Sequence, residues 1–165
     1  MITIKQGDVF ESNMEVLVIP VNCVGVMGKG LALQFKNKYP EMYKIYKDDC
    51  TYHAISLGHL AYHSKNSHCN KGIIFFPTKN HWKDQSHMDD IQNGLNDFIR
   101  HIREWDIKNI AFPAIGCGLG GLYFPDVAGL IVKRLIPLQI DVEIYEFWQY
   151  VNNINDQTED LWSPN

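Results

Sequence analysis

Lys79 is the residue of this chain whose type and position best fit covalent chemistry. It follows the strongly apolar run IIFFP (73–77), so its amine is expected to be partly desolvated. Desolvation lowers the pKa of a lysine, which can then act as a nucleophile, whereas a charged lysine can stabilise a transition state. A surface lysine at the end of a strand is the commoner alternative. His81 and Trp82 come next in the sequence, and either could line the same cleft.

Two glycine-rich segments each follow an apolar run. GVMGKG (25–30) comes after VLVIPV (16–21), and IGCGLGG (115–121) comes after KNIAFP (108–113). Glycines let backbone N–H groups approach phosphate oxygens closely. Neither segment is a P-loop, and the second is a poor dinucleotide fingerprint because no acid falls about 20 residues downstream on a strand end. The pair predicts two backbone cradles around one anionic ligand, with simple tight turns as the structural alternative.

Two polar residues next to predicted strands are weaker candidates for ligand binding. Asn22 directly follows the second strand, and its amide suits sugar hydroxyls, although satisfying loop backbone groups is the favoured role on sequence alone. Asp8 can accept a hydrogen bond from an exocyclic amine or serve as an ordinary turn aspartate.

The thiols and imidazoles do not predict a second catalytic centre. Cys117 lies between glycines and has no Asp or His near it in sequence, so a small packed thiol is expected. His63, His68 and Cys69 lack a fourth ligand and a standard zinc spacing, so we expect no metal site. No cofactor is expected either.

Length and composition favour one ordinary globular domain. The 165 residues are 45% hydrophobic and 21% charged, and no apolar run approaches the roughly 18 residues that span a bilayer. The N-terminus lacks a signal pattern, and the four cysteines show no close pairing, so a cytoplasmic protein with reduced thiols and no membrane partner is expected.

The net charge of −4 argues against a protein that coats nucleic acid non-specifically. Residues 135–165 contain six acids and no Lys or Arg, which leaves 13 acids against 15 bases, or +2, in residues 1–134. Several lysines lie in or after the first glycine segment: Lys29, Lys36, Lys38, Lys44 and Lys47. A solvated helix face is favoured over a patch that binds phosphates along a nucleic acid.

Apolar patterning predicts strands that alternate with helices. The strands are expected at 2–5, 16–21, 55–64 (with a bulge at Gly58), 73–77, 108–113 and 141–147. The helices are expected at 31–39, 41–50, 88–105 and from Pro125 to Pro137. This order indicates a three-layer α/β sandwich with a largely parallel sheet, in which ligands bind beyond the carboxyl ends of the strands. Asp8, Asn22, Lys79 and both glycine segments all follow strands.

Four segments together resemble the macro domain, the ADP-ribose-binding three-layer α/β/α sandwich with a mixed, largely parallel sheet. They are GDVF (7–10), VNCVGVMGKGLALQFK (21–36), FPTKNHW (76–82) and IGCGLGGL (115–122). Two of these segments, VNCVGVMGKGLALQFK and FPTKNHW, are similar to those of the branch that contains the DarG antitoxins and the terminal ADP-ribose protein glycohydrolases. The resemblance implies a macro domain over residues 1–148 and an acidic, polar tail over 149–165.

The resemblance also implies a role for each matching residue. Lys79 matches the catalytic lysine of this branch. Asp8 would bind the adenine amino group and Val9 would add a backbone contact, while Phe147 or Trp148 would stack on adenine. The distal ribose would be held by Asn22, Met27, Gly28, Lys29 and Gly30, and Thr78 would also contact ADP-ribose. The diphosphate would be wrapped by Gly116, Cys117, Gly118, Leu119, Gly120 and Gly121.

Two departures from the branch bear on function. Terminal ADP-ribose protein glycohydrolases carry an aspartate where this chain has Gly120, so the DarG pattern fits better. DarG antitoxins also carry a C-terminal toxin-binding domain, and this chain has only a short acidic tail after the macro domain. A toxin partner is therefore possible, but reversal of the modification is expected rather than neutralisation by binding the toxin.

The leading expectation is a monomeric glycohydrolase that removes ADP-ribose from a nucleobase in single-stranded DNA. One alternative is an ADP-ribose hydrolase that acts on protein carboxylate esters or on ADP-ribose-1″-phosphate. Another is a non-catalytic module that binds ADP-ribose or a related nucleotide signal. A binding module does not need Lys79, so this lysine separates the two classes.

Overall fold

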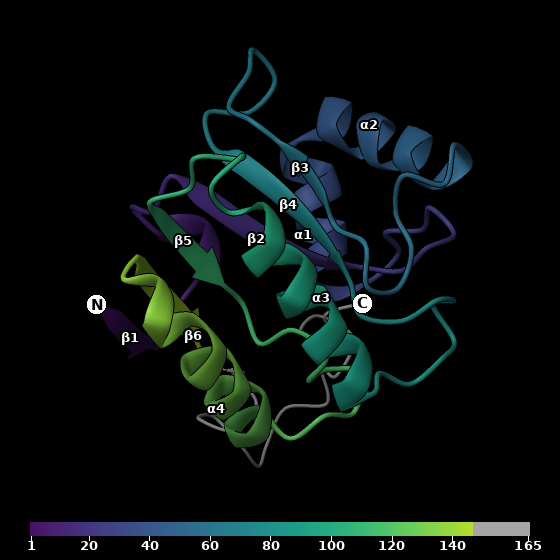
Figure 1. Ribbon diagram of the computed structural model, residues 1–165. Helices are drawn as coiled ribbons and strands as arrows, with labels where there is room; N and C mark the ends of the chain where they lie inside the picture. The colour runs from purple at the N-terminus through teal and green to yellow at the C-terminus, as the bar shows by residue number, and fades with distance from the viewer. Residues whose placement is uncertain (147–165) are drawn as a thin grey trace.

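Strands and helices alternate along most of the chain, as the apolar patterning predicts. The computed structural model describes residues 1–146, and Figure 1 shows their arrangement. The elements are β1 (Ile2–Lys5), η1 (Val9–Glu11), β2 (Val16–Val21), α1 (Gly30–Lys38), α2 (Pro40–Thr51), β3 (Ala61–His63), β4 (Gly72–Pro77), α3 (Met88–His101), β5 (Asn109–Phe112), α4 (Phe124–Leu135), η2 (Ile136–Leu138) and β6 (Asp141–Tyr145).

The strands form one mixed sheet in the order β1-β6-β5-β2-β4-β3. Every neighbouring pair is parallel except β3 and β4, which are antiparallel at one edge. β2 and β4 are buried along their whole length, as expected for central strands covered on both faces. The predicted mixed, largely parallel sheet is confirmed.

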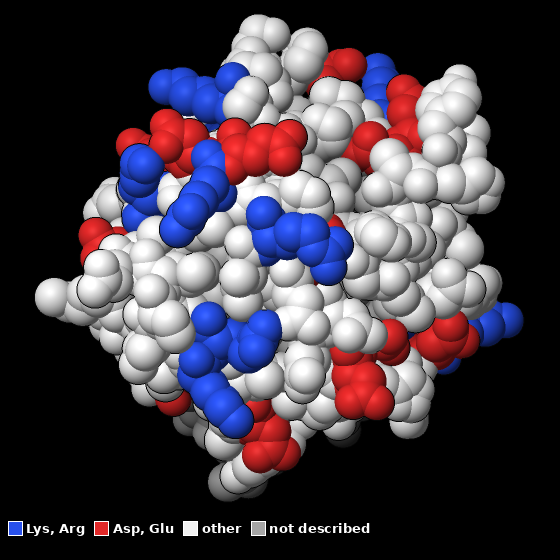
Figure 2. Space-filling model, in the orientation of Figure 1, with Lys and Arg blue, Asp and Glu red and all other residues white. Residues whose placement is uncertain are grey.

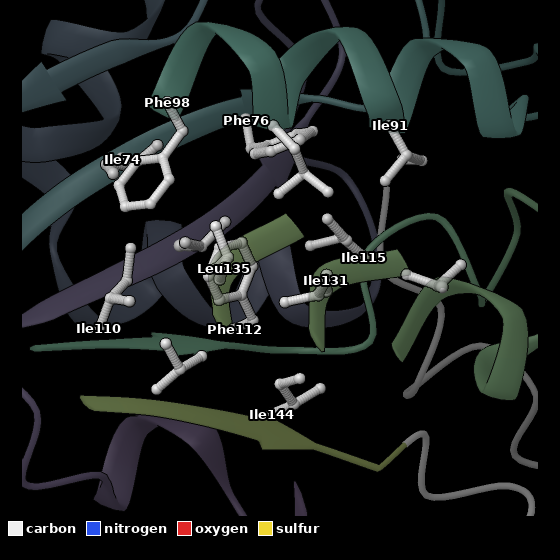
Figure 3. Packing of buried hydrophobic residues seen from close by; sticks show 14 of the residues in the cluster. Ile74, Phe76, Ile91, Phe98, Ile110, Phe112, Ile115, Ile131, Leu135 and Ile144 are labelled. Carbon is white, nitrogen blue, oxygen red and sulfur yellow. The ribbon is translucent and has the colours of Figure 1, made fainter. Parts of the chain in front are cut away.

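Helices cover both faces of the sheet. On one face, buried residues of α3 and α4 pack on the strands, and Figure 3 shows Ile91 and Phe98 projecting from α3 towards the layer that contains Phe112, Ile131 and Leu135. On the other face, Phe35 of α1 and Tyr46 of α2 pack against the strands in a separate cluster. The three-layer α/β/α sandwich is therefore confirmed, with one hydrophobic core on each side of the sheet.

Two predicted boundaries are wrong. The strand expected at 55–64 is confined to Ala61–His63, and Gly58 lies in a turn that His59 N closes by donating to Ser56 O at 2.8 Å. The residue before β3, Leu60, donates its N–H to the buried carboxylate of Asp97 on α3 at 2.9 Å. The alternation of apolar and polar residues over 55–60 therefore reflects tertiary contacts rather than strand pairing.

The helix expected at 88–105 ends at His101, and a run of turns follows it. Its predicted core face is nevertheless correct, because Ile91, Leu95 and Phe98 are all but fully buried. The last strand ends at Tyr145, and the part of the prediction that reaches residue 147 lies outside the described residues.

None of the described helices is long and apolar enough to cross a membrane. On the face shown in Figure 2, basic and acidic side chains are interspersed, and neither sign covers a broad area. This face has no extended basic track of the kind that binds nucleic acid through charge alone.

Candidate functional site

The parallel strands bring the predicted site residues to one edge of the sheet. β1, β2, β4 and β5 run in the same direction, so their carboxyl ends meet at that edge. Asp8, Asn22, Lys79 and Gly116 follow these four strands in turn. The chain is thus folded so that the segments that sequence analysis selected separately lie around one region.

Lys79 is buried in this region, and its amine makes no hydrogen bond to any residue of the described part of the chain. The residue is only 1% exposed. Burial lowers the pKa of Lys79, and the nearby carboxylate of Asp84 opposes this effect only in part. A larger fraction of this amine is therefore neutral near physiological pH than of an exposed lysine, which favours nucleophilic behaviour.

Asn22 holds the first glycine loop in shape. Its Oδ1 accepts hydrogen bonds from Val24 N at 3.1 Å, Val26 N at 3.3 Å and the Tyr46 hydroxyl at 2.8 Å. Its Nδ2 donates to Val26 O at 2.8 Å. The side chain is fully buried, so the structure assigns it the loop-stabilising role and leaves at most one amide hydrogen for a ligand.

The first loop ends at the start of α1, where several backbone N–H groups are available to a ligand. Within the described residues, the N–H groups of Met27, Gly28 and Gly30 donate to no protein acceptor. Lys29 is the N-cap of α1, and its side chain does not cap the helix. A helix N-terminus with unused N–H groups is suited to bind an oxygen-rich or anionic group. The Met27 side chain is buried in the core, so only its backbone can serve a ligand.

The second glycine loop is a tight backbone turn. Gly116 has a φ of +74°, and its carbonyl accepts from Leu122 N at 2.9 Å, while Gly121 N donates to Gly118 O at 3.0 Å. In the described part of the chain, the N–H groups of Gly118, Leu119 and Gly120 donate to no protein acceptor. Successive unused N–H groups in a turn form a concave site for an anion.

Gly120 has no room for a side chain. A Cβ at this position would lie 2.4 Å from Ser86 Oγ and 2.5 Å from Gly116 O. Ser86 N also donates to Gly120 O at 2.9 Å, so the loop after β4 is fixed to the second glycine loop. A carboxylate at position 120 would require both the Ser86 side chain and the Gly116 backbone to move.

A pocket of about 460 Å³ lies between the two glycine loops and the loop after β4. Its size is within the usual range for small-ligand sites. Its lining residues are Val26, Gly28, Lys29, Trp82, Lys83, Asp84 and Leu119. Trp82 lines this pocket, whereas His81 and Lys79 are not among its lining residues.

The remaining predicted contacts lie around this centre. Asp8 is exposed, and its Oδ1 accepts from Phe10 N at 2.9 Å, so it serves at least as a turn aspartate. Val9 is packed in the core, and Thr78 is fully buried with its N–H donating to Val21 O at 2.9 Å. Phe147 and Trp148, the suggested adenine-stacking residues, lie outside the described residues.

Cys117 is a packed thiol, as expected. It is buried beside Ile115 O, and burial raises the pKa of its thiol to about 12, so it is a poor nucleophile. All four cysteines are free. Among the described residues, no group of three or more His, Cys, Asp or Glu side chains could hold a metal ion.

Sequence reasoning missed three residues that shape the site: Tyr46, Asp84 and Ser86. Tyr46 reaches the first loop from α2, and Ser86 reaches the second loop from the segment before α3. Tyr46 and Ser86 each act on a loop distant in sequence, so no local pattern could have revealed them, whereas Asp84 acts within its own turn, where it accepts from His81 N.

A three-layer α/β/α sandwich with glycine loops at the carboxyl edge of a mixed sheet defines the fold, and the family comparison agrees. The family model for the macro domain matches residues 18–131, and the chain belongs to this family.

Within the family, the chain is similar to macrodomains of DarG proteins. The solved macrodomain of Mycobacterium tuberculosis DarG shares 44% identity with a TM-score of 0.82, over 88% of this chain and 97% of that one. Thermosipho africanus DarTG, solved in complex with ADP-ribose, shares 34% identity with a TM-score of 0.84, over 96% of this chain and 44% of that one.

Among curated proteins, a Mycobacterium tuberculosis protein named DNA ADP-ribosyl glycohydrolase is 44% identical over 147 residues, covering 88% of this chain and 42% of that protein. The chain therefore spans about two fifths of the length of the relatives named DNA ADP-ribosyl glycohydrolase.

Proposed function

We propose that this chain is an ADP-ribosyl glycohydrolase that removes ADP-ribose from nucleobases of single-stranded DNA. The observation that carries the proposal is the buried amine of Lys79 at the end of β4. Within residues 1–146 this amine has no hydrogen-bond partner, and the two glycine loops beside it offer backbone donors that bond to no protein acceptor. The names of the curated relatives, DNA ADP-ribosyl glycohydrolase, support the same substrate class.

In this proposal ADP-ribose lies along the carboxyl edge of the sheet. The diphosphate binds the N–H groups of Gly118, Leu119 and Gly120, because an anion suits a concave row of donors. The distal ribose lies against the loop that ends at Gly28 and Gly30. Its anomeric carbon, C1″, then faces Lys79, while the adenine extends towards Asp8 and Val9.

The chemical step follows from the state of Lys79. Its neutral Nζ attacks C1″ and forms an N–C bond, while the bond between C1″ and the base nitrogen breaks and its electron pair leaves with the base. The base takes up a proton, and the lysine loses one. Water then replaces the lysine at C1″, which releases ADP-ribose and restores the amine.

Gly120 supports DNA rather than protein carboxylate esters as the substrate. The ester-cleaving enzymes of the resembling branch place an aspartate there, and this chain lacks the space for one. Lys79 itself supports an enzyme rather than a binding module, because an unpartnered buried amine is unfavourable for stability and ligand binding alone does not need it.

The test is hydrolysis of an oligonucleotide ADP-ribosylated on thymine. We expect the wild type to release ADP-ribose and Lys79→Ala to lose the activity by at least about 100-fold, as for removal of a nucleophile. Lys44→Ala, at an exposed lysine paired with Glu41, is the matched control and should keep full activity. Free ADP-ribose should bind all three proteins in calorimetry.

Failure of the wild type to release ADP-ribose, or equal release by Lys79→Ala, would overturn the proposed function. Absence of measurable ADP-ribose binding would also overturn the binding-module alternative.

A further inference from the structure

The pocket between the glycine loops has a wall that the proposed ADP-ribose contacts do not use. This wall is the loop after β4, which contributes Trp82, Lys83 and Asp84. Trp82 is 44% exposed, although large aromatic side chains are usually well buried. Apolar side chains face it from the two glycine loops, since Val26 is 38% exposed and Leu119 is 46% exposed.

The Trp82 side chain is presented by a rigid turn. Asp84 Oδ2 accepts from His81 N at 2.9 Å, and Asp84 N donates to His81 O at 2.9 Å. Lys83 N donates to the His81 Nδ1 atom at 3.1 Å. The rings of His81 and Trp82 lie 5.2 Å apart at an angle of 31°. Because the backbone of this turn is already ordered, it loses little conformational entropy when Trp82 binds a ligand.

Cations accompany the aromatic surface. Lys83 Nζ lies 5.0 Å from the centre of the Trp82 ring, and Lys29 lines the same pocket from the opposite loop. The acid of this lining, Asp84, has its carboxylate bonded within the turn. An indole face beside lysines suits single-stranded nucleic acid, in which bases stack and phosphates need cations.

We propose that Trp82 is a stacking platform for a nucleobase of the DNA strand, beside the ADP-ribose site. The proposal rests on the proposed function and adds a specificity-determining residue to it. Trp82 stacks on the modified base or its neighbour, Lys83 contacts an adjoining phosphate, and Val26 with Leu119 complete the apolar walls. Trp82 therefore contributes to recognition of the strand and not of free ADP-ribose.

The same loop links the platform to the chemistry. Lys79 and Trp82 are three positions apart, and Ser86 fixes the end of the loop to Gly120. A base stacked on Trp82 is thereby held at a defined distance from the strand end that carries the amine. This arrangement positions the leaving group, which is a recognised source of rate acceleration.

The test compares Trp82→Ala, Trp82→Phe and Tyr52→Ala on three ligands: free ADP-ribose, an ADP-ribosylated peptide and a thymine-ADP-ribosylated oligonucleotide. Tyr52 is a matched control because it is an aromatic that is 79% exposed and lies outside the pocket. Binding is measured by calorimetry with every variant in a Lys79→Ala background, so that no ligand is consumed. Hydrolysis is measured with Lys79 intact.

We expect Trp82→Ala to weaken oligonucleotide binding by about 5- to 100-fold, the usual effect of losing one base stack, and to leave free ADP-ribose binding within about twofold. Trp82→Phe should retain most of the affinity, and Tyr52→Ala should change nothing. An equal loss for free ADP-ribose would overturn the proposal, as would no loss for the oligonucleotide.

Two further outcomes separate this proposal from others. If Trp82→Ala weakens binding of an ADP-ribosylated peptide as much as binding of the oligonucleotide, the proposal is overturned, because Trp82 would then be a general apolar contact. If the wild-type protein does not hydrolyse the oligonucleotide, the proposed function is overturned but the role of Trp82 is not. The binding comparison decides that role, because it does not depend on turnover.

Discussion

The two glycine loops that flank Lys79 are held in shape by opposite means. The first loop depends on a buried side chain, because the Asn22 amide bonds to the loop backbone and to Tyr46 from α2. The second loop depends on the absence of side chains, because Gly116 takes a positive φ and Gly120 lies against Ser86 Oγ and the Gly116 backbone.

The difference shows how each loop can fail. Removing a polar partner should disorganise the first loop, since buried backbone groups would lose their hydrogen bonds. Adding atoms should disorganise the second loop, since there is no space for them. The first loop adjoins the start of α1, where the distal ribose is proposed, and the second offers the proposed diphosphate cradle, so the two failures should affect different parts of the ligand.

Asn22→Ala should have the largest effect. It removes the acceptor of Val24 N, Val26 N and the Tyr46 hydroxyl at once, and leaving buried groups without partners is costly. We expect a loss of about 3 kcal/mol in the free energy of unfolding, measured by urea denaturation, together with weaker ADP-ribose binding. Asn13→Ala, at an exposed asparagine, is the control and should stay within about 0.5 kcal/mol of the wild type. A loss of stability of similar size in Asn13→Ala would contradict the loop-stabilising role of Asn22.

Gly120→Ala should come next. The added methyl group would meet both Ser86 Oγ and Gly116 O, so we expect a loss of about 1–3 kcal/mol in stability and weaker ADP-ribose binding. Gly129→Ala is the matched control, because a Cβ added to this glycine of α4 would meet nothing within 4 Å, and the variant should gain up to about 1 kcal/mol. Adding Ser86→Ala should restore only part of the loss, since the backbone contact remains; full restoration would show that Ser86 alone limits the space.

Lys79→Met should make the protein more stable, while it abolishes the activity. An unpartnered buried amine is unfavourable, so its replacement by an apolar chain of similar length should add about 1–2 kcal/mol, or a few degrees in Tm. The pKa of Lys79 is lower in the folded state than its ordinary value of 10.5. The unfolded state therefore binds more protons between these two values, and the stability of the wild type rises with pH across that window.

The gain from Lys79→Met should consequently be greatest below the lowered pKa and should vanish as the pH approaches 10.5. Thermal denaturation at several pH values measures it. A variant that is less stable than the wild type at every pH would show that Lys79 has a stabilising partner.

Tyr46→Phe should have the smallest effect on the first loop. It removes one hydroxyl that donates to Asn22 O and Oδ1, while the ring keeps its packing. We expect a loss of about 1 kcal/mol in stability. Faster amide exchange should be confined to the first loop, with the second loop unchanged; an equal change in both loops would contradict their independence.

The sheet and the position of the site were predictable because they depend on local patterns. Buried runs such as VLVIPV (16–21) and GIIFFP (72–77) are read directly from the sequence, and parallel strands place the segments after them at one edge. Three tertiary contacts were not predictable: the hydrogen bond from Tyr46 to Asn22, the contact between Ser86 and Gly120, and the hydrogen bond from Leu60 to Asp97. Each joins segments far apart in the chain, so only the folded arrangement reveals it.

The central claim is that a buried neutral amine at the end of β4 carries out the chemistry. Single-turnover release of ADP-ribose from a saturating thymine-ADP-ribosylated oligonucleotide, followed as a function of pH, tests it most directly. The rate of the wild type should rise about tenfold per pH unit up to the lowered pKa of Lys79 and then stay level, while Lys79→Met should be inactive throughout. A rate that falls as the pH rises, or substantial release by Lys79→Met, would contradict the account.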